Sequence, residues 1–571
     1  MFIEAIPNRN SPPAILLRRS IRRGARTYKE TLLNLTRWPA DVVVGLDRLL
    51  RGEKLVSLGD VFVVERSLPH GHVEAVLGMI EKLAVDKVIA SRRCRERDLV
   101  VAMVAERILY PCSKLATTRL WHTTTLAEQL AVGDADVDEL YDALDWLLAR
   151  RERIEKKLAA RHLSEGAVVL YDVSSSSYEG KTCALAQFGY NRDGEKGLRS
   201  IVYGVMTDEQ GRPIAVDVYS GDTADPTTVP DQVEKLRERF GLEKVVLVGD
   251  RGMLTETQID HIKQHPQLGW ISTLRSAAIR RLVQSGAIQM SLFDQQNLAE
   301  ITSPDFPGER LVVCYNPLMA DERRAKREAL VKATEERLEK IRRAVGRRTQ
   351  TPLSKTDIAL KVGAVIRRYK VAKHFQLTIR DGYFSWLRCE ETIASEAALD
   401  GIYVIRTSEP PDRIAAQQAV RSYKALARLE EAFRHLKGLD LLIRPIRHRT
   451  DPHVRAHVFL CMLAYYIEWH MRRAWAPLLF QDEEISDLRQ TRDPLAPASA
   501  SASAKRKKTT RHSPDGLPLH SFRTLLAELA TRTRNRCRTK TAKLSHAFVQ
   551  HSHLTPLQAR AFELLGVCPV N

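Results

Sequence analysis

The segment from residue 167 to residue 274 constrains the fold most, because short β-branched runs and helical stretches alternate along it in a definite order. The order is three strands, a helix, a strand, a helix and a strand. Three antiparallel strands followed by crossover units predict a mixed sheet covered by helices. The expected strands are 167–173, 200–206, 214–219, 244–249 and 269–274, and the first helix is 229–240.

Two aspartates come directly after apolar strands of this segment. Asp172 follows the run AVVLY, and Asp250 follows KVVLVG. An acid in a central strand is costly to bury unless it binds something, so both are candidate metal ligands. The alternative for a single such residue is an aspartate that ends a strand and caps the following turn. Two such strands in one domain weaken that alternative.

The third candidate acid, Glu430, lies on an amphipathic helix expected over 411–439. At about 100° per residue, Glu430 shares one face with Tyr423, Arg434 and Lys437, whereas Glu431 lies about 100° away. An i,i+4 ion pair between Glu430 and Arg434 on a solvated face is the alternative. Chemistry with two metal ions needs about three carboxylates converging on one phosphate, with the ions about 4 Å apart. Asp172, Asp250 and Glu430 fit that requirement.

The spacing on this helix matches a family signature of Tyr, two residues, Arg, three residues, Glu, six residues and Lys. Tyr423, Glu430 and Lys437 occupy three of these positions, and Leu426 stands at the arginine position. On these residues the chain resembles the DDE transposases of the bacterial insertion-sequence-four superfamily. Arg434, on the same face as Glu430, is expected to supply the missing phosphate contact.

Further blocks resemble the same family over residues 90 to 475. They are YPCSKLATTR, YDVSSSSYEG, GYNRDGEKGLRSIVYGVM, SGDTADPTT, VLVGDRGM, DGIYVIRTS and GLDLLIRPIRHR. The resemblance implies an RNase H-like fold with a largely β insertion before the last acidic helix. It also implies recognition of terminal inverted repeats, strand cleavage, and transfer of the 3′-OH to a target. The expected cofactor is Mg²⁺, which Mn²⁺ can replace, and the expected assembly is a dimer on double-stranded DNA.

The composition agrees with a polyanionic partner. Lys and Arg number 89 against 70 Asp and Glu, a formal net charge of +19, and each neutralised phosphate releases counterions. We expect DNA contacts from Arg192 and Lys196, in a glycine-flanked loop near the first acidic strand, and from Tyr423, Arg434 and Lys437. A solvated hairpin is the alternative reading of the loop.

The fold class expected is α/β, an RNase H-like mixed-sheet core with an inserted subdomain, a mainly helical N-terminal region before it and a helical tail after it. Low-complexity composition at 493–516 predicts a disordered linker. The expected parts are a basic β-hairpin arm at 1–40, a helical DNA-binding region at 41–162, the core at 163–275 and 400–476, the insertion at 276–399, and a basic C-terminal region at 477–571.

Other classes of protein fit less well. The eight cysteines are scattered, and His448, His453 and His457 lack a further ligand that would complete a zinc site. The longest apolar run, 458–467, is too short to span a bilayer, so we expect a cytoplasmic, nucleoid-associated bacterial protein. Two alternatives stay open: a metal-dependent nuclease without strand transfer, and a catalytically inactive DNA-binding relic.

Overall fold

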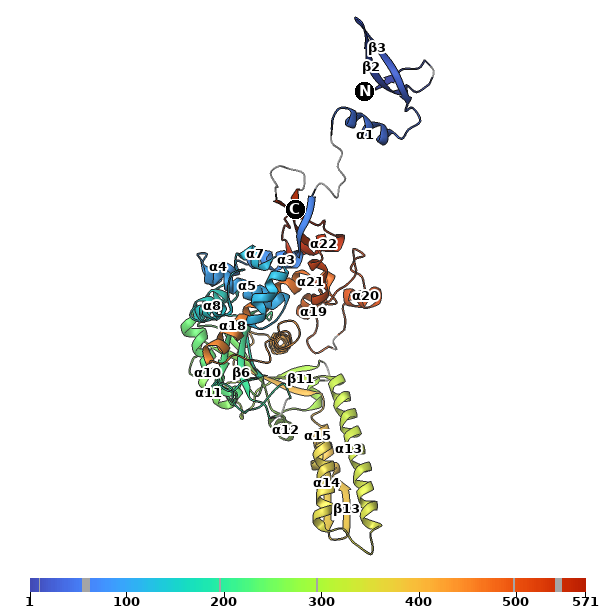
Figure 1. The fold of residues 1–571 in the computed structure, drawn as a ribbon. Coiled ribbons are helices and arrows are strands. Elements are labelled where there is room, and N and C mark those ends of the chain that lie inside the picture. The colour runs from blue at the N-terminus through green and yellow to red at the C-terminus, as the bar shows by residue number, and fades with distance from the viewer. Residues whose placement is uncertain are drawn as a thin grey trace. The chain divides into compact units, whose positions relative to one another are not determined.

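The computed structural model describes residues 1–9, 11–53, 62–194, 197–293, 296–496, 499–539 and 547–570 (Figure 1). Lys196 and residues 497–498 of the expected linker lie outside these ranges. The chain divides into two compact units. The first contains Met1–Leu68, Thr533–His553 and Val570–Asn571, and the second contains Pro69–Arg532 and Leu554–Pro569.

The first unit contains two small three-stranded sheets. One has the order β1-β2-β3, and β2 and β3 form the expected hairpin around Gly24, whose φ of 61° suits a tight turn. The other has the order β16-β15-β4. The bounds are β1 Phe2–Ile6, β2 Ala14–Arg23, β3 Arg26–Asn34, α1 Ala40–Leu50, β4 Phe62–Pro69, β15 Thr533–Thr539 and β16 Ala547–His551.

The second unit begins with a set of helices packed on α18 (Asp451–Ala474), which is buried along most of its length. Helices α5 and α8 contact α18, and α9 contacts the sheet through β7. The bounds are α3 Gly71–Lys82, α4 Val85–Ile89, α5 Arg95–Leu109, α6 Lys114–Leu120, α7 Leu126–Leu130, α8 Val137–Leu148 and α9 Arg151–His162. Residues 71–162, which belong to the region expected to be helical, are therefore mainly helical in the second unit.

The centre of the second unit is a mixed sheet, and the predicted fold class is confirmed. Five strands have the order β7-β6-β5-β8-β9, in which β5, β6 and β7 are antiparallel and β5, β8 and β9 are parallel. This is the order of an RNase H-like core. The bounds are β5 Val168–Ser177, β6 Ser200–Asp208, β7 Pro213–Tyr219, α10 Val229–Glu234, β8 Val246–Val248, α11 Glu256–Lys263 and β9 Gly269–Thr273.

The insertion contributes strands to the same sheet. β14 (Ile402–Thr407) pairs antiparallel with β9 on one side and with β11 (Arg310–Tyr315) on the other, and β10 (Leu298–Ile301) pairs with β11. The sheet thus has eight strands. Residues 330–386 of the insertion have an apolar core of their own, in which α13 and α14 lie side by side (Figure 1). Other elements of the insertion are α12 Ser276–Gln284, α13 Pro317–Gly346, α14 Lys355–Tyr369, β12 Phe375–Arg380, β13 Tyr383–Arg388 and α15 Glu390–Ala397. Of these, α12 packs instead against β11 and β14.

The helix expected over 411–439 is two helices. α16 (Ala416–Lys424) contacts β9 and β14, whereas α17 (Leu426–Lys437) contacts β5, and the chain breaks between them at Ala425. The break lets one amphipathic segment follow two different parts of the sheet.

The C-terminal region differs from the expectation in two respects. It carries strands β15 and β16 between helices α21 (Phe522–Ala530) and α22 (Pro556–Leu565), so it is not all helical. The prediction of disorder over 493–516 is wrong for α20 (Ala502–Thr510). The buried Lys507 ammonium donates to the carbonyls of Ala476, at 2.6 Å, and Gln481, at 2.8 Å, and pairs with Glu483. Those long-range contacts fix a segment whose composition alone favours disorder. In the described parts of the chain, every helix is too short or too polar to cross a membrane.

A buried ion network joins the insertion's strands to the core. Arg406 on β14 is 4% exposed, and its guanidinium donates to both carboxylate oxygens of Glu309, at 2.6 and 2.7 Å. It also contacts Glu256 on α11 at 2.5 and 3.0 Å. Lys263, which is 40% exposed, also lies 3.2 Å from Glu309. Without Arg406 the buried carboxylate would keep only this partly exposed partner, and the loss of a buried counter-charge costs several kcal/mol.

We predict that Arg406→Leu lowers the free energy of unfolding by about 3 kcal/mol, because it leaves Glu309 buried without its guanidinium. Thermal unfolding followed by circular dichroism measures the shift in midpoint. The control is Arg343→Leu, which removes an exposed pair with Glu339 that should contribute less than about 1 kcal/mol. Equal midpoints for the two variants would contradict the prediction.

Candidate active site

Asp172 lies within β5 rather than at its end, since the strand continues to Ser177. Its Oδ1 accepts a hydrogen bond from the backbone N–H of Val173 at 2.8 Å. Burial raises the pKa of Asp172 to about 7, with a further contribution from the negative charge of Asp250, while Arg192 opposes the rise. Among the described residues, no Lys or Arg forms an ion pair with this carboxylate. It is a half-buried acid without an ion-pair partner among the described residues.

Asp250 reaches the same edge of the sheet as Asp172 because β5 and β8 pair in parallel. In their register Leu170 lies opposite Val248, so each aspartate is two residues beyond that pair. Asp250 Oδ1 accepts from the N–H groups of Gly252, at 2.9 Å, and Met253, at 2.7 Å. These bonds hold the turn that follows β8 and orient the carboxylate.

Glu430 is carried over β5 by α17, the helix that packs on that strand. The side chain is exposed. Within the described ranges it has no hydrogen-bond or ion-pair partner, so the expected alternative, a pair with Arg434, does not form. The neighbouring Glu431 lies near His435 instead, with 3.8 Å between its Oε1 and Nε2 of the ring. The two adjacent glutamates are therefore distinguished by their surroundings.

The three acids line one pocket of about 630 Å³, called the acidic pocket below. Their oxygen atoms are spread over it, since no set of ligand atoms from all three lies within 4.8 Å. The pocket is also lined by Arg251, Thr273, Leu274, Ser276, Ile279, Asn316, Met319, Arg323, Leu399, Ile402, Tyr403, Tyr423, Lys424, Leu426 and Ala427. Residues from the sheet, from α16 and α17 and from the insertion thus meet around the acids.

Of the five residues predicted to contact DNA, one lines this pocket. The hydroxyl groups of Tyr423 and Thr273 are 3.1 Å apart, which connects α16 to the end of β9. Arg434 is exposed and does not line the pocket. Arg192 pairs with Asp225, and its backbone N–H donates to Ser175 Oγ at 3.0 Å. Lys196 is outside the described residues.

Lys437 also lies away from the acidic pocket, in a separate ion network. Its ammonium donates to Asp193 Oδ1 at 2.9 Å, and Arg444 pairs with the same carboxylate, which is 2% exposed. The second oxygen of Asp193 accepts from the N–H of Ser177 at 3.1 Å. The C-terminal end of α17 is thereby tied to the end of β5.

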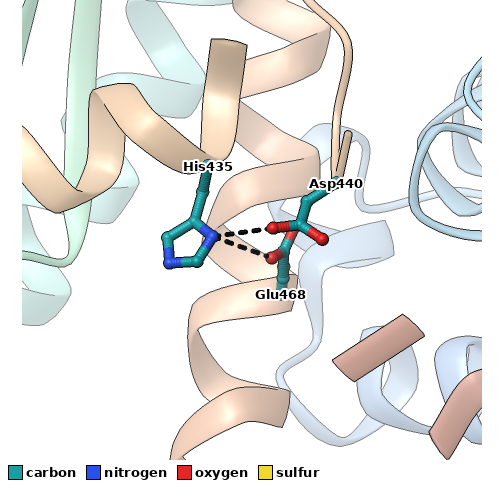
Figure 2. Close-up of side chains that lie close together, drawn as sticks. All are labelled: His435, Asp440 and Glu468. Carbon is teal, nitrogen blue, oxygen red and sulfur yellow. Dashed lines mark hydrogen bonds and ion pairs between the residues drawn. The ribbon is translucent and has the colours of Figure 1, made fainter. Parts of the chain in front are cut away.

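A second cluster of polar side chains lies at His435, Asp440 and Glu468 (Figure 2). His435 Nδ1 is 2.9 Å from Asp440 Oδ2 and 3.7 Å from Glu468 Oε1. In the described parts of the chain this is the one group of three potential metal ligands whose atoms lie within 4.8 Å of one another. Arg472 donates to Glu468 at 2.5 Å and lies 2.9 Å from Asp440. Arg523 lies 3.6 Å from Asp440.

The carboxyl groups of this cluster already face positively charged side chains, because the guanidinium groups of Arg472 and Arg523 lie close to Asp440 and Arg472 also contacts Glu468. Burial lowers the pKa of His435, but hydrogen bonds with Asp440 and Glu431 outweigh it and hold the pKa above its usual value. Burial raises the pKa of Glu468. The cluster connects α17, the following loop, α18 and α21, which is a structural role.

Two of the three histidines considered for a zinc site, His453 and His457, contact other groups of the chain. His453 Nε2 lies 3.3 Å from Asp145 Oδ2, and its ring stacks on Tyr141. His457 Nε2 lies 3.2 Å from the carbonyl oxygen of Ile443.

Sequence reasoning missed the three cations of the acidic pocket, Arg251, Arg323 and Lys424. Arg251 directly follows Asp250, and Lys424 directly follows Tyr423, so both lie beside predicted site residues. Arg323 belongs to a long charged helix in which no pattern distinguishes it. Only the tertiary position of α13 identifies Arg323.

The fold and the acidic pocket define a DDE-type phosphoryl-transfer enzyme. The chain belongs to the family described as "Transposase DDE domain", whose model matches residues 164–467 and includes all three acids. Divalent metal ions are the general cofactors of this family. No curated protein matches the chain. Among solved structures, a cryo-EM structure of the piggyBac transposase synaptic complex with hairpin DNA aligns with 78% of this chain and 88% of that chain, at 10% identity and a TM-score of 0.30.

We predict that Asp172→Asn stabilises the metal-free protein near pH 8 and removes its stabilisation by Mg²⁺. Because the pKa of Asp172 is raised to about 7 in the folded protein, its ionisation lowers the free energy of unfolding progressively between about pH 4 and about pH 7. Asparagine does not ionise, so the variant avoids this loss of stability. We expect a bound ion to stabilise the wild type by mass action and not to stabilise the variant. Thermal midpoints at pH 5 and pH 8, with and without Mg²⁺, measure both effects.

The matched control for this prediction is Asp260→Asn, which changes an exposed acid on α11. It should respond to Mg²⁺ as the wild type does. An Mg²⁺-dependent midpoint shift of wild-type size in Asp172→Asn would contradict the prediction.

Proposed function

We propose that this chain is an insertion-sequence transposase of the insertion-sequence-four superfamily, which binds terminal inverted repeats, cleaves DNA and joins the 3′-OH end to target DNA. The observation that carries the proposal is the acidic pocket. Asp172, Asp250 and Glu430 come from two strands and a helix far apart in sequence and line the same cavity within the family match. The net charge of +19 supports DNA as the partner.

The donor set of the acidic pocket fits Mg²⁺, with Mn²⁺ as a substitute. Asp172, Asp250 and Glu430 would hold the metal, because hard divalent cations prefer carboxylate oxygens and Asp172, which is half-buried, forms no ion pair within the described residues. Carboxylates spread around a cavity suit two ions better than one. When bound, a pair of such ions activates the attacking oxygen and stabilises the leaving oxygen of phosphoryl transfer.

The chain's own residues would position the DNA around these acids. Tyr423, held by Thr273, forms part of the pocket wall, while Arg434 presents an exposed guanidinium one turn beyond Glu430. We also assign DNA contacts to Arg192, Lys437 and Lys196. Each of these cations neutralises phosphate charge and carries little sequence information.

Recognition of the inverted repeats is assigned to the β2–β3 hairpin and to the helices before residue 163, in a dimer on DNA. Contacts of the core go mainly to backbone phosphate, so sequence must be read elsewhere. The tip of the hairpin carries Arg22, Arg23 and Arg26, which are exposed. Deletion of the whole N-terminal part is a poor test, because α5 and α8 pack on α18 and their removal would unfold the core.

We predict that replacing Arg22, Arg23 and Arg26 together by Ala weakens binding to inverted-repeat DNA more than binding to random DNA of equal length. Competition binding measured by fluorescence anisotropy gives the ratio of the two affinities. The control replaces Arg367 and Arg368 on α14, which should weaken both duplexes equally. An unchanged ratio in the hairpin variant would show that the arm does not read the repeats.

One experiment separates a transposase from a metal-dependent nuclease. The protein is incubated with labelled DNA carrying the element's end and its flank, supercoiled target plasmid and Mg²⁺. A transposase yields a nick at the element's boundary and then a product in which the labelled end is joined to the plasmid. A nick without the joined product would reject strand transfer, and the absence of both would reject the proposal.

We predict that Glu430→Gln lowers single-turnover cleavage at least about 10³-fold and leaves DNA affinity nearly unchanged, because the acid holds metal rather than DNA. Asp172→Ala and Asp250→Ala should behave alike. Glu431→Gln is the control, since Glu431 lies beside Glu430 but outside the acidic pocket. Wild-type cleavage by Glu430→Gln, or an equal loss in Glu431→Gln, would remove Glu430 from the site.

A further inference from the structure

The acidic pocket is also lined by cations, which differ in the partners they have within the chain. Three cations line it: Arg251, Arg323 and Lys424. Lys424 donates to the carbonyl of Pro494 at 2.5 Å, and its ammonium lies 5.9 Å from the centre of the Tyr403 ring. In the described residues, neither Arg251 nor Arg323 has a carboxylate partner within ion-pair distance.

Arg323 stands out from its neighbours on α13. Arg324 pairs with Asp321 at 3.4 Å, and Arg327 makes a two-pronged pair with Asp400, at 2.6 and 2.9 Å. Arg323 has only a neutral anchor, since its Nη1 donates to the carbonyl of Leu399 at 3.3 Å. The guanidinium therefore keeps its full charge and most of its donors available toward the pocket.

The start of α13 is held firmly in place relative to the sheet. The Arg327–Asp400 pair, about 10% exposed on both sides, lies one helical turn after Arg323. The N–H of Asn316, the residue that caps α13, donates to the carbonyl of Gly401 at 2.9 Å, just before β14. Since β14 pairs directly with β9, the position of Arg323 is coupled to the strands that carry the site.

Besides Glu430, helix α17 contributes only apolar side chains, Leu426 and Ala427, to the pocket. Leu426, at the beginning of α17, lines the same cavity as Arg323. Arg434 does not line it. A phosphate bound over three acids needs fixed positive charge besides the metal, and a guanidinium is suited to it because it binds phosphate with two parallel hydrogen bonds.

We propose that Arg323 of the insertion binds the DNA phosphate in the acidic pocket and supplies the positive charge that Leu426 does not. This inference rests on the proposed function. The insertion is then part of the phosphate-binding site as well as an extension of the sheet.

The test compares Arg323→Ala, Arg323→Lys and the control Arg324→Ala with the wild type, after thermal midpoints have shown that all are folded. Binding to element-end DNA is measured without metal at several salt concentrations. Arg323→Ala should bind more weakly and reduce the slope of log K against log salt by about 1, the loss of one phosphate contact. Arg324→Ala should match the wild type in both measurements.

Single-turnover cleavage with Mg²⁺ gives a second, independent measurement. Arg323→Ala should be slower by about 10²- to 10³-fold, and Arg323→Lys should fall between it and the wild type, because lysine keeps the charge without the two-pronged geometry. Adding Leu426→Arg to Arg323→Ala should restore the rate at least about 10-fold, since it returns a cation to the same pocket.

The outcomes distinguish this inference from the function on which it rests. If the wild type binds but does not cleave, the proposed function fails, whereas the binding comparison of Arg323 and Arg324 still decides the phosphate contact. Equal binding and cleavage by Arg323→Ala and Arg324→Ala overturn the inference. A cleavage loss in Arg323→Ala that Leu426→Arg does not relieve also overturns it, because the defect is then not a missing cation in the pocket.

Discussion

β5 and β8 pair in parallel with Leu170 opposite Val248, and the arrangement of the acidic pocket depends on this register. Both aspartates come two residues after that pair, so the sheet itself brings Asp172 and Asp250 to one edge. A shift of one residue would turn one of the two carboxylates to the opposite face of the sheet, because side chains alternate along a strand. The strands around them are buried, and the burial of their apolar side chains fixes the register.

The pocket is completed by the insertion, which is anchored to the core through β14. That strand lies between β9 and β11, and the buried network of Arg406, Glu309 and Glu256 joins it to α11. Because Asp400 and Gly401 precede β14 and hold the start of α13, the same strand also places Arg323. A segment remote in sequence therefore contributes to the site through main-chain pairing.

The parts of the fold that local patterns determine were predictable from the sequence, and the parts that long-range contacts determine were not. The strands of the core and α18 follow from runs of apolar residues, and the confirmed fold class follows from their order. The joining of β10 and β11 to the sheet, the break at Ala425 and the helix α20 depend on partners far along the chain. The composition of α20 is typical of a disordered segment, and its order depends on the buried Lys507 and on hydrogen bonds from Ser501 to Asp482 and from Ser503 to Glu483.

In the candidate site, too, local patterns could be predicted from the sequence and long-range contacts could not. A strand followed by an aspartate is visible in a sequence, and so is the face of a helix, which is why Asp172, Asp250 and Glu430 could be proposed. Helical periodicity also placed Arg434 and Lys437 with Glu430, and all three lie on α17, but neither cation lines the acidic pocket. Lys437 is engaged by Asp193, a partner that no helical pattern could indicate.

The charged residues of α17 differ in whether they have a partner within the protein. At its C-terminal end Lys437 is bound to Asp193, and His435 is bound to Asp440 near Glu468. On its N-terminal side, the preceding α16 is fixed by the hydroxyl contact of Tyr423 with Thr273. Between these fixed points Glu430 has no partner within the described residues. The charges near both ends of this segment are already paired, whereas among the described residues Glu430, Asp172 and Arg323 form no ion pair. This fits the proposed roles of metal ions and phosphate as their partners.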